Sequence, residues 1–394
     1  MKQTIRDLQP AGQTVFLRVD FNVPMHLGTV TDDSRVAAAV PTISELSRAG
    51  ARVLCASHLG RPQGNRRQDL SLETVATVLG DHLGRKVLFV PESHGPQVEQ
   101  FVAGMGDGDV ALLENLRFDP GEEKNDPALA RKLAAPASIY VNDAFGTAHR
   151  AHASTAAITR FLSPAVAGLL LQREVTALSR LLGHVDRPYI VVLGGAKISG
   201  KIDLMESLME QADAILVGGA MSYTLLRAQG LETGQSLVEE DQIEMARHIL
   251  ERAEAQGVEL VLPLDHLVAP AVESDTATTT DGAAIPADLM ACDVGPRTVD
   301  LFSRWIREAA TILWNGPMGI FENPRFAAGT RVIGAAIAAS SSFSVVGGGD
   351  SVAAVRQFQM EDGFSHLSTG GGASLEFLAG RALPGLVALA EKDN

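Results

Sequence analysis

One short stretch of the chain combines glycines with two lysines. Residues 194–201 read GGAKISGK, which from Gly195 gives the spacing G-x-x-x-x-G-K of a P-loop. The next residue is Ile202, where a P-loop has the Ser or Thr that binds magnesium. If a helix begins directly after the glycines, Lys197 and Lys201 share one face and hold an anion between them. A damaged P-loop, a chance run of glycines, a solvated lysine face and a different nucleotide loop all remain open.

Glycines also follow several apolar runs in the second half of the chain. They form the groups 194–195, 218–219, 347–349 and 370–372. Glycine lets the backbone approach a flat or multiply charged ligand, and the N–H groups at the start of the next helix bind anions. These turns therefore predict a nucleotide with its phosphates. The alternative is that the glycines only relieve steric crowding in tight turns.

Asp350 belongs to the third of these turns, GGGDS (347–351). At the start of a helix an aspartate is most often an N-cap, worth about 1 kcal/mol. A carboxylate beside nucleotide phosphates also suits Mg²⁺, which binds one or two carboxylates together with phosphate oxygens and water. Asp350 is thus a candidate magnesium ligand, with the N-cap as the alternative.

Charged and polar side chains lie near the ends of the apolar runs in the first half, or in adjoining loops. They are Asp20, Asn22, Arg35, His58, Arg61, Arg117, Asp143 and Arg150. Guanidinium groups bind phosphate and carboxylate through two parallel hydrogen bonds. If these side chains converge, they form a site for a small, highly anionic metabolite. His149 and His152 give H-x-x-H, but no acidic third ligand has a familiar spacing, so we do not expect zinc.

The elements that must position these residues follow from the apolar pattern. Short apolar, β-rich runs alternate with longer helical patterns throughout the chain. This alternation predicts βαβ units and parallel sheets that are covered by helices on both faces. In such sheets ligands bind beyond the carboxyl ends of the strands. The predicted fold class is α/β, with two doubly wound parallel-sheet, Rossmann-like domains.

A helical pattern separates the two halves. In LLLQREVTALSRLLG (169–183), Leu171, Val175, Leu178 and Leu182 recur at helical spacing. We predict a connecting helix over 171–184. The alternative is an ordinary crossover helix within one large sheet.

Composition limits the class of protein. A chain of 394 residues with 46% hydrophobic and 20% charged residues is typical of a globular protein with more than one domain. Its net charge of −14 argues against nucleic-acid and membrane-surface binding. The uncharged segment 332–349 contains four serines and a glycine triplet, which favours a buried helix and strand over a membrane span. Two cysteines outside any metal spacing and a charged N-terminus indicate a cytoplasmic protein.

Eight stretches, in the same order along the chain, resemble the motifs of the phosphoglycerate kinase family. They are RVDFNVP (18–24), SHLGRP (57–62), LLENLRF (112–118), VNDAFGTAHRAH (141–152), GGAKISGK (194–201), WNGPMGIFE (314–322), GGGDS (347–351) and STGGGASLEFL (368–378). The resemblance covers nearly the whole chain. It implies reversible transfer of the acyl phosphate of 1,3-bisphosphoglycerate to Mg-ADP in glycolysis, giving 3-phosphoglycerate and Mg-ATP. GGAKISGK then resembles this family's nucleotide loop, and its likeness to a P-loop is accidental.

The resemblance also implies roles for residues of this sequence. It implies phosphoglycerate at Asp20, Asn22, Arg35, His58, Arg61, Arg117 and Arg150. It implies ATP or ADP at Gly195, Lys201, Gly218, Gly219, Asn315, Glu322, Gly348, Gly349, Asp350 and Ser351, with Glu322 at the ribose and Asp350 on Mg²⁺. Arg35, Lys197 and the N–H groups of the Gly370–Gly372 turn, Gly371 and Gly372 among them, are expected at the phosphoryl group in transit.

The expected domains combine the resemblance with the helical pattern. They are a phosphoglycerate-binding domain (1–170), the connecting helix (171–184), a nucleotide-binding domain (185–373) and a C-terminal segment that returns to the first domain (374–394). We expect a monomer that closes by hinge bending near the connecting helix. No nucleic-acid or membrane partner is expected.

Two departures from the family pattern concern the nucleotide base. The chain has GGAMS (218–222) where the family usually has GGGMA, and Cys292 where an aliphatic residue is usual. Base preference therefore stays open. A nicotinamide-dependent dehydrogenase is not favoured, because no turn has G-x-G-x-x-G with an acidic residue about 20 positions further on. A catalytically silent nucleotide or anion sensor is the remaining alternative.

Overall fold

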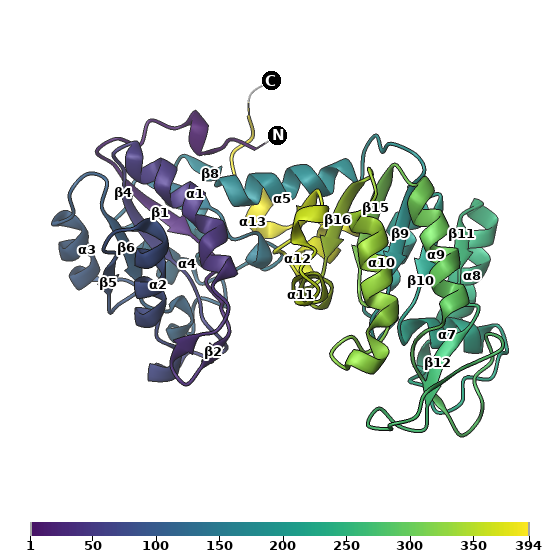
Figure 1. The fold of residues 1–394 in the computed structure, drawn as a ribbon. Helices are drawn as coiled ribbons and strands as arrows, with labels where there is room; N and C mark the ends of the chain where they lie inside the picture. Colours follow the sequence, from purple (N-terminus) through teal and green to yellow (C-terminus); the bar gives the residue numbers. More distant parts are fainter. Residues whose placement is uncertain (1, 393–394) are drawn as a thin grey trace. The chain divides into compact units, whose positions relative to one another are not determined.

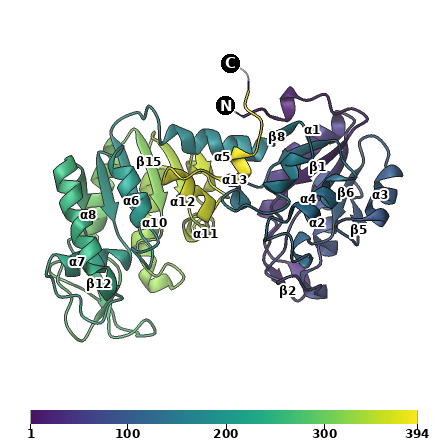
Figure 2. The ribbon, with the colours of Figure 1, turned by 180° about the vertical axis from the view of Figure 1, so that it is seen from behind.

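The computed structural model describes residues 2–392, and this part of the chain forms two compact units. Unit 1 comprises the residues up to Thr176 together with those from Ala382 onward, and unit 2 comprises Ala177–Arg381. Each unit is built on one six-stranded sheet, as Figures 1 and 2 show from opposite sides.

The sheet of unit 1 is entirely parallel, with the strand order β5-β6-β4-β1-β7-β8. The strands are β1 (Thr14–Arg18), β4 (Arg52–Ala56), β5 (Leu88–Val90), β6 (Val110–Leu113), β7 (Ile139–Asn142) and β8 (Ala165–Ala167). All residues of β1, β6 and β7 are buried, as expected for parallel strands covered on both faces.

The remaining elements of unit 1 are helices, short 3-10 turns and one hairpin. The helices are α1 (Ser34–Arg48), α2 (Glu73–Leu83), α3 (Pro96–Ala103), α4 (Pro127–Ala134) and α13 (Pro384–Val387). The 3-10 turns are η1 (Ile5–Asp7), η2 (Gln68–Leu70), η3 (Leu116–Phe118), η4 (Phe145–Thr147) and η5 (Ala157–Arg160). The hairpin pairs β2 (Met25–His26) with β3 (Thr29–Val30).

The six-stranded sheet of unit 2 is also parallel, with the order β11-β10-β9-β15-β16-β17. The strands are β9 (Tyr189–Leu193), β10 (Ala214–Val217), β11 (Glu259–Val261), β15 (Thr311–Asn315), β16 (Phe343–Gly347) and β17 (His366–Leu367). From β9, the strands β10 and β11 follow one another toward one edge of the sheet. From β15, which pairs with β9, the strands β16 and β17 follow one another toward the other edge. The junction of β9 and β15 is therefore the topological switch point, where open α/β sheets bind ligands.

Helices cover both faces of this sheet. They are α6 (Ile202–Met209), α7 (Met221–Ala228), α8 (Ile243–Gln256), α9 (Pro296–Glu308), α10 (Ala328–Ala338), α11 (Gly349–Gln357) and α12 (Gly372–Leu378). Figure 1 shows α9 and α10 on one face, and Figure 2 shows α6 and α8 on the other. A small antiparallel sheet joins β12 (His266–Ala269), β13 (Thr278–Thr279) and β14 (Met290–Val294). The 3-10 turns are η6 (Glu240–Gln242), η7 (Pro324–Phe326) and η8 (Glu361–Gly363).

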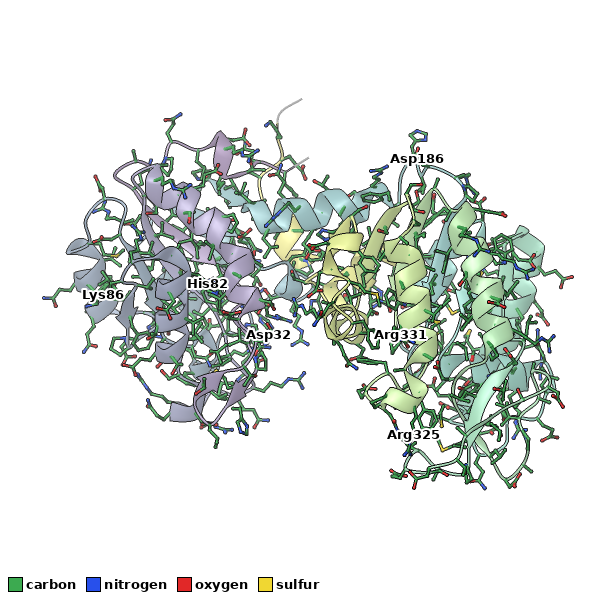
Figure 3. The ribbon with its side chains drawn as sticks, viewed as in Figure 1. Asp32, His82, Lys86, Asp186, Arg325 and Arg331 are labelled. Atoms are coloured by element: carbon green, nitrogen blue, oxygen red, sulfur yellow. The ribbon has the colours of Figure 1, made fainter. Side chains whose placement is uncertain are left out.

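The predicted fold class is confirmed, because both large sheets are parallel and doubly wound. The interpretation of segment 332–349 is confirmed as well, since it contains most of α10 followed by β16. Between residues 2 and 392 there is no helix with the length and apolar character needed to cross a membrane. Charged residues such as Lys86, Asp186 and Arg325 lie on the surface (Figure 3).

Helix α5 (Leu169–Arg180) carries the chain from unit 1 into unit 2 and occupies most of the segment predicted as a connecting helix. Its first turn is held by Asp143, the residue after β7. The Asp143 carboxylate accepts hydrogen bonds from the N–H groups of Leu170 (2.8 Å) and Leu171 (3.1 Å). A Cβ atom at Gly168 would lie 2.2 Å from this carboxylate, so only glycine fits there.

The C-terminal part of the chain completes unit 1. The N–H of Gly385 in α13 donates to the carbonyl of Ala148 (2.8 Å), and its carbonyl accepts from the Asn142 side chain (3.1 Å). Near the chain ends, the N–H of Gln3 donates to the carbonyl of Ala390 at 2.9 Å. Unit 1 is therefore built from both ends of the sequence.

Candidate active site

Several of the predicted side chains meet at the carboxyl edge of the unit 1 sheet. Asp20 lies two residues beyond β1, and its carboxylate pairs with the guanidinium of Arg35 at the start of α1. The same carboxylate lies 3.9 Å from Nδ1 of His58, which lies two residues beyond β4. The Asn22 side-chain oxygen accepts the N–H of Gly60 at 2.8 Å. The loops after β1 and β4 are thus joined by polar contacts.

Arg117, in the turn after β6, contacts the loop that follows β4. Its Nη1 donates to the carbonyl of Gly60 at 2.8 Å, and Gly60 holds a positive φ of 63°. The Arg117 residue is only 5% exposed. Burial lowers the pKa of its guanidinium, and Glu123, 3.2 Å from Nε, opposes that shift. This arginine is therefore held in place before any ligand arrives.

Arg61 and Arg150 are exposed. Arg61 follows Gly60 directly, and among residues 2–392 it makes no hydrogen bond or ion pair. Arg150 donates from Nε to the His149 ring at 3.2 Å, and its charge helps to lower the pKa of the Arg117 guanidinium. The site thus combines fixed cations with two whose charge faces solvent, an arrangement suited to a small anion.

A buried network that the sequence analysis missed supports this edge. Arg18, the last residue of β1, is fully buried; its Nε donates to the Ser154 hydroxyl at 2.8 Å. Ser154 in turn donates to the carboxylate of the fully buried Glu122 at 2.5 Å. The one signal in the sequence for this network was the charged Arg18 inside the apolar run TVFLRV. Ser154 lies 136 residues further along the chain, where no local pattern points.

The network also sets the state of His58. Burial lowers the pKa of the His58 ring well below 6.5, and the charges of Arg18, Arg117 and Arg35 lower it further. Nη2 of Arg18 lies 3.3 Å from Nδ1 of His58, and an arginine can only donate. The neutral ring therefore carries its proton on Nε2, and His58 is a neutral donor in a cationic site.

In unit 2, Lys201 lies at the topological switch point. Its ammonium donates to the carbonyl of Gly194, after β9, at 2.5 Å and to the carbonyl of Asn315, at the end of β15, at 2.8 Å. A Cβ atom at Gly316 would lie 2.6 Å from the ammonium and 2.2 Å from the Gly194 carbonyl, so glycine is required there. Burial lowers the Lys201 pKa from 10.5 to about 7, while Asp350 acts in the opposite direction.

The prediction that Lys197 and Lys201 share a helix face is wrong. Helix α6 begins only at Ile202, so both lysines belong to the loop before it. Lys197 is exposed, whereas the Lys201 side chain turns inward to the two carbonyls. The physical reason is that a distant carboxylate, Glu239, binds the N–H groups of Ile198 and Ser199, which keeps this stretch in a loop.

The turn before α11 excludes one of the two interpretations of Asp350, the N-cap. The N-cap of α11 is Gly348, at a φ of 90°, and the helix has no side-chain cap. Asp350 is therefore not an N-cap; its carboxylate lines a slot that begins at the β-strand ends. Ser351 is fully buried, and its hydroxyl accepts the N–H of Gly316 at 2.6 Å. The indole N–H of Trp314 donates to the carbonyl of the same glycine at 2.9 Å.

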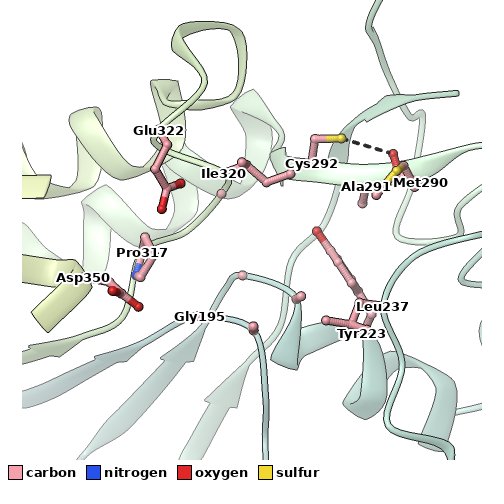
Figure 4. Close-up of a pocket in the computed structure, with 14 residues that line it drawn as sticks. Gly195, Tyr223, Leu237, Met290, Ala291, Cys292, Pro317, Ile320, Glu322 and Asp350 are labelled. Atoms are coloured by element: carbon pink, nitrogen blue, oxygen red, sulfur yellow. Dashed lines mark hydrogen bonds between the residues drawn. The ribbon is translucent and has the colours of Figure 1, made fainter. Parts of the chain in front are cut away.

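The slot has a volume of about 290 Å³ and a polar and an apolar part (Figure 4). It is lined by Gly195, Ala196, Gly219, Ala220, Tyr223, Leu237, Met290, Ala291, Cys292, Pro317, Gly319, Ile320, Glu322 and Asp350. The carboxylates of Glu322 and Asp350 lie on one side, and Met290, Ala291 and Cys292 lie across from them. The slot therefore suits a flat apolar group attached to a polar, charged one.

Four of the predicted nucleotide residues line this slot, namely Gly195, Gly219, Glu322 and Asp350. Asn315, Gly348 and Ser351 support its wall: the Asn315 side chain lies against Gly348, and Ser351 holds Gly316. Gly218 packs against Met318, where a Cβ atom would lie 2.5 Å from the sulfur. Gly349 is the exposed first residue of α11.

Tyr223 is a lining residue that the sequence analysis did not single out. It is 3% exposed, and Figure 4 shows its hydroxyl directed into the slot. Burial raises the pKa of the phenol, so the hydroxyl stays protonated and able to donate. Its position in the helix that follows the 218–219 glycines was the available signal.

The Gly370–Gly372 turn leads into α12 of unit 2. Gly371 is the N-cap of this helix at a φ of 53°, and Gly372 is its first residue. Helix α12 is tied to α6, because the Ser207 hydroxyl donates to the carbonyl of Leu378 at 2.8 Å. The turn is thereby linked to the helix that follows Lys201.

The residues present fit a magnesium ion only as part of a nucleotide complex. Within residues 2–392, no group of three or more His, Cys, Asp or Glu residues is placed to hold a metal. Asp350 supplies one carboxylate at the polar side of the slot. Mg²⁺ characteristically takes its remaining ligands from phosphate oxygens and water, so a single carboxylate is compatible with such a site.

The depressed pKa of Lys201 predicts a specific dependence of stability on pH. As the pH rises from about 7 toward 10, the native lysine loses its proton while the unfolded one keeps it, so the free energy of unfolding rises with pH by at most about 1.4 kcal/mol per unit. Lys201→Met removes this contribution. The unfolding free energy of the wild type minus that of Lys201→Met should therefore become more positive from pH 7 to pH 9.

Urea unfolding followed by tryptophan fluorescence measures this difference, since Trp305 and Trp314 both belong to unit 2. Lys197→Met is the matched control, because it removes an exposed lysine of the same loop. A constant difference for Lys201→Met would contradict an inward lysine with a lowered pKa.

Comparisons with known proteins agree with this geometry. The model of the family described as phosphoglycerate kinase matches residues 5–381. The chain is 52% identical over 393 residues to a phosphoglycerate kinase of Anaeromyxobacter dehalogenans, and the match covers 99% of each chain. It is 50% identical over 398 residues to the phosphoglycerate kinase of Thermosipho africanus, a match that covers 99% of this chain and 98% of the relative. The solved phosphoglycerate kinase of Coxiella burnetii matches with a TM-score of 0.90 and 40% identity over 98% of both chains. The family model covers nearly the whole chain and these relatives are 40–52% identical to it, so this chain belongs to the phosphoglycerate kinase family.

Proposed function

We propose that the protein catalyses reversible phosphoryl transfer between 1,3-bisphosphoglycerate and Mg-ADP, giving 3-phosphoglycerate and Mg-ATP in glycolysis. The observation that carries this proposal is the pairing of a cationic sheet edge in unit 1 with a slot of mixed polarity in unit 2. Family membership and the names of the relatives support it. No observation favours a catalytically silent sensor.

Phosphoglycerate is proposed to bind in unit 1. Arg61 and Arg150 extend into solvent and are suited to the phosphate, while Arg35, Arg117 and the neutral His58 are already fixed by the chain. Asp20 and Asn22 hold Arg35 and Gly60 in place and offer acceptors to the hydroxyl group of the ligand. Seven residues thus divide between charge recognition and orientation.

The nucleotide is proposed to bind in the slot of unit 2. The base suits the apolar side at Met290, Ala291 and Cys292, and the ribose suits the carboxylate of Glu322. The phosphates then run toward Lys201 and the start of α11. A magnesium ion held by Asp350 supplies positive charge to the phosphate oxygens when it is bound.

Transfer itself requires positioning and cationic stabilisation, because the charge of the transferred group spreads over its equatorial oxygens. Lys197 is exposed and so available to this group, and we assign Arg35 and the N–H groups of Gly371 and Gly372 to the same role. The reacting atoms must approach to about 3–3.5 Å with water excluded, so we propose that the two units close over the substrates by hinge bending. No covalent enzyme intermediate is needed.

The cellular compartment and the oligomeric state are proposed from the resemblance to the phosphoglycerate kinase family. We assign the protein to the cytoplasm as a monomer. Cys55 and Cys292 are buried and unpaired, which is ordinary for a reducing compartment. Size-exclusion chromatography with light scattering measures the oligomeric state, and a dimer would contradict this assignment.

A coupled assay tests the proposed function. The purified protein is supplied with 1,3-bisphosphoglycerate, ADP and Mg²⁺, and ATP formation is followed continuously. We expect ATP to form only when all three are present, and 3-phosphoglycerate with ATP to drive the reverse reaction. The absence of turnover, with both ligands shown to bind, would favour the silent sensor.

Arg61→Ala should weaken 3-phosphoglycerate binding about ten- to a hundredfold, because a hydrogen bond to a charged group is worth about 1.5–3 kcal/mol. Arg61 is exposed, so its loss should leave the fold intact. Isothermal titration with 3-phosphoglycerate and ADP separately measures both affinities. Arg66→Ala, a nearby exposed arginine paired with Glu92, is the control and should change neither. Equal losses for both ligands in Arg61→Ala would contradict a separate phosphoglycerate site.

Asp350→Asn should raise the Mg²⁺ concentration needed for half-maximal activity about tenfold or more, the scale on which even outer-shell partners of a metal act. The melting temperature should barely change, because Gly348 and not Asp350 caps α11. A magnesium titration of the coupled assay, with calorimetric melting in parallel, measures both. Asp362→Asn removes an exposed charge elsewhere in unit 2 as the control. An unchanged magnesium curve would exclude Asp350 as the ligand.

A further inference from the structure

The loop that carries the two lysines is held by a carboxylate from about 40 residues further along the chain. Oε2 of Glu239 accepts the N–H of Ile198 at 2.6 Å and the N–H of Ser199 at 3.2 Å. Oε1 of the same carboxylate accepts the Ser199 hydroxyl. One side chain thus takes three donors from two consecutive loop residues.

Glu239 is itself anchored to the wall of the slot. Its N–H donates to the hydroxyl of Thr224 at 3.1 Å, and Thr224 is 1% exposed in α7. Helix α7 also carries Tyr223, and Leu237, two residues before Glu239, lines the slot. The Glu239 carboxylate therefore links the slot wall to the lysine loop.

This contact occupies backbone N–H groups of GGAKISGK with a carboxylate of the chain itself. Consecutive backbone N–H groups in a glycine-rich loop form a concavity that binds anions, and in a P-loop they bind phosphate. Here the N–H groups of Ile198 and Ser199 bind Glu239. Lys197 immediately precedes them and Lys201 follows two residues later, so the carboxylate holds the backbone from which both ammonium groups extend.

We propose that Glu239 is a positioning residue of the phosphoryl-transfer site. It fills the anion-binding concavity of the loop and so holds the backbone of Lys197 and Lys201 in the geometry that transfer requires. The inference rests on the proposed function, because it concerns the two lysines assigned to the phosphates. It adds a residue of unit 2 that contacts neither substrate in this assignment.

Positioning and stability make different demands on this contact. Glu239 is only partly buried, and a hydrogen bond to a charged group contributes about 1.5–3 kcal/mol to stability. A displacement of about 1 Å at a reacting centre, in contrast, costs on the order of a hundredfold in rate. Loss of Glu239 should therefore reduce kcat even at temperatures at which the variant is fully folded.

The test compares two substitutions at Glu239 with one at its neighbour. Glu239→Ala should lower kcat about ten- to a hundredfold, with ADP affinity from isothermal titration changed far less. Glu239→Gln keeps an acceptor oxygen for the two N–H groups and should recover most of the lost kcat. Glu240→Ala removes the same charge from an exposed residue that lies 3.7 Å from Arg227, and kcat should not change.

A second measurement reports on the loop without turnover. Amide hydrogen exchange of Ile198 and Ser199 should be slow in the wild type and in Glu239→Gln, and faster in Glu239→Ala. Unchanged exchange in Glu239→Ala would show that the carboxylate does not hold the loop in solution, which overturns the inference.

The kinetic outcomes separate this inference from the function on which it rests. An inactive wild-type protein would overturn the proposed function. An active wild type with unchanged kcat in Glu239→Ala would overturn the positioning role alone. Equal loss in Glu239→Ala and Glu239→Gln would show that the negative charge matters and not the hydrogen bonds, which also overturns it.

Discussion

The contact of the Lys201 ammonium with two strand-end carbonyls is the constraint on which unit 2 depends. It links the end of β9 to the end of β15 at the topological switch point. Position 316 beside it must be glycine, because a Cβ atom there would lie 2.2 Å from the Gly194 carbonyl oxygen. Ser351 and Trp314 then hold the Gly316 peptide from both sides, one at its N–H and the other at its carbonyl. The next residue, Pro317, lines the slot.

The two units hold their cations by different means. In unit 1 the buried Arg18 is balanced by the carboxylate of Glu122, with the Ser154 hydroxyl between them, so its positive charge is met by a negative one. In unit 2, backbone carbonyls of Gly194 and Asn315 bind the Lys201 ammonium directly. Burial of a positive charge costs free energy, and uncharged carbonyls offset this cost less completely than a carboxylate does. Burial therefore lowers the pKa of Lys201 to about 7. Unit 1 therefore presents permanent charge, and unit 2 presents a group that can change its charge.

The sequence predicted the elements and the candidate residues better than the contacts between them. Alternating apolar and helical patterns were enough for the parallel sheets, and the rule that ligands bind at strand ends was enough to select Asp20, His58 and Arg117. The pairing of Arg18 with Ser154 was not predictable, because 136 residues separate them and no periodicity connects them. The helix expected directly after the glycines at 194–195 failed for a similar reason. Local spacing favoured it, but the N–H groups of Ile198 and Ser199 bind Glu239, about 40 residues further along the chain, and the stretch is a loop.

The joining of the two chain ends in unit 1 has a consequence for synthesis. Unit 2 is one continuous stretch, Ala177–Arg381, inserted between the parts of unit 1. Gly385 and Ala390 must reach Ala148 and Gln3 before unit 1 has all its hydrogen bonds. Because the ribosome synthesises the chain from the N-terminus to the C-terminus, all residues of unit 2 have been synthesised before the residues from Ala382 onward are added. The hydrogen bonds that close unit 1 can therefore form only after all of unit 2 has been synthesised.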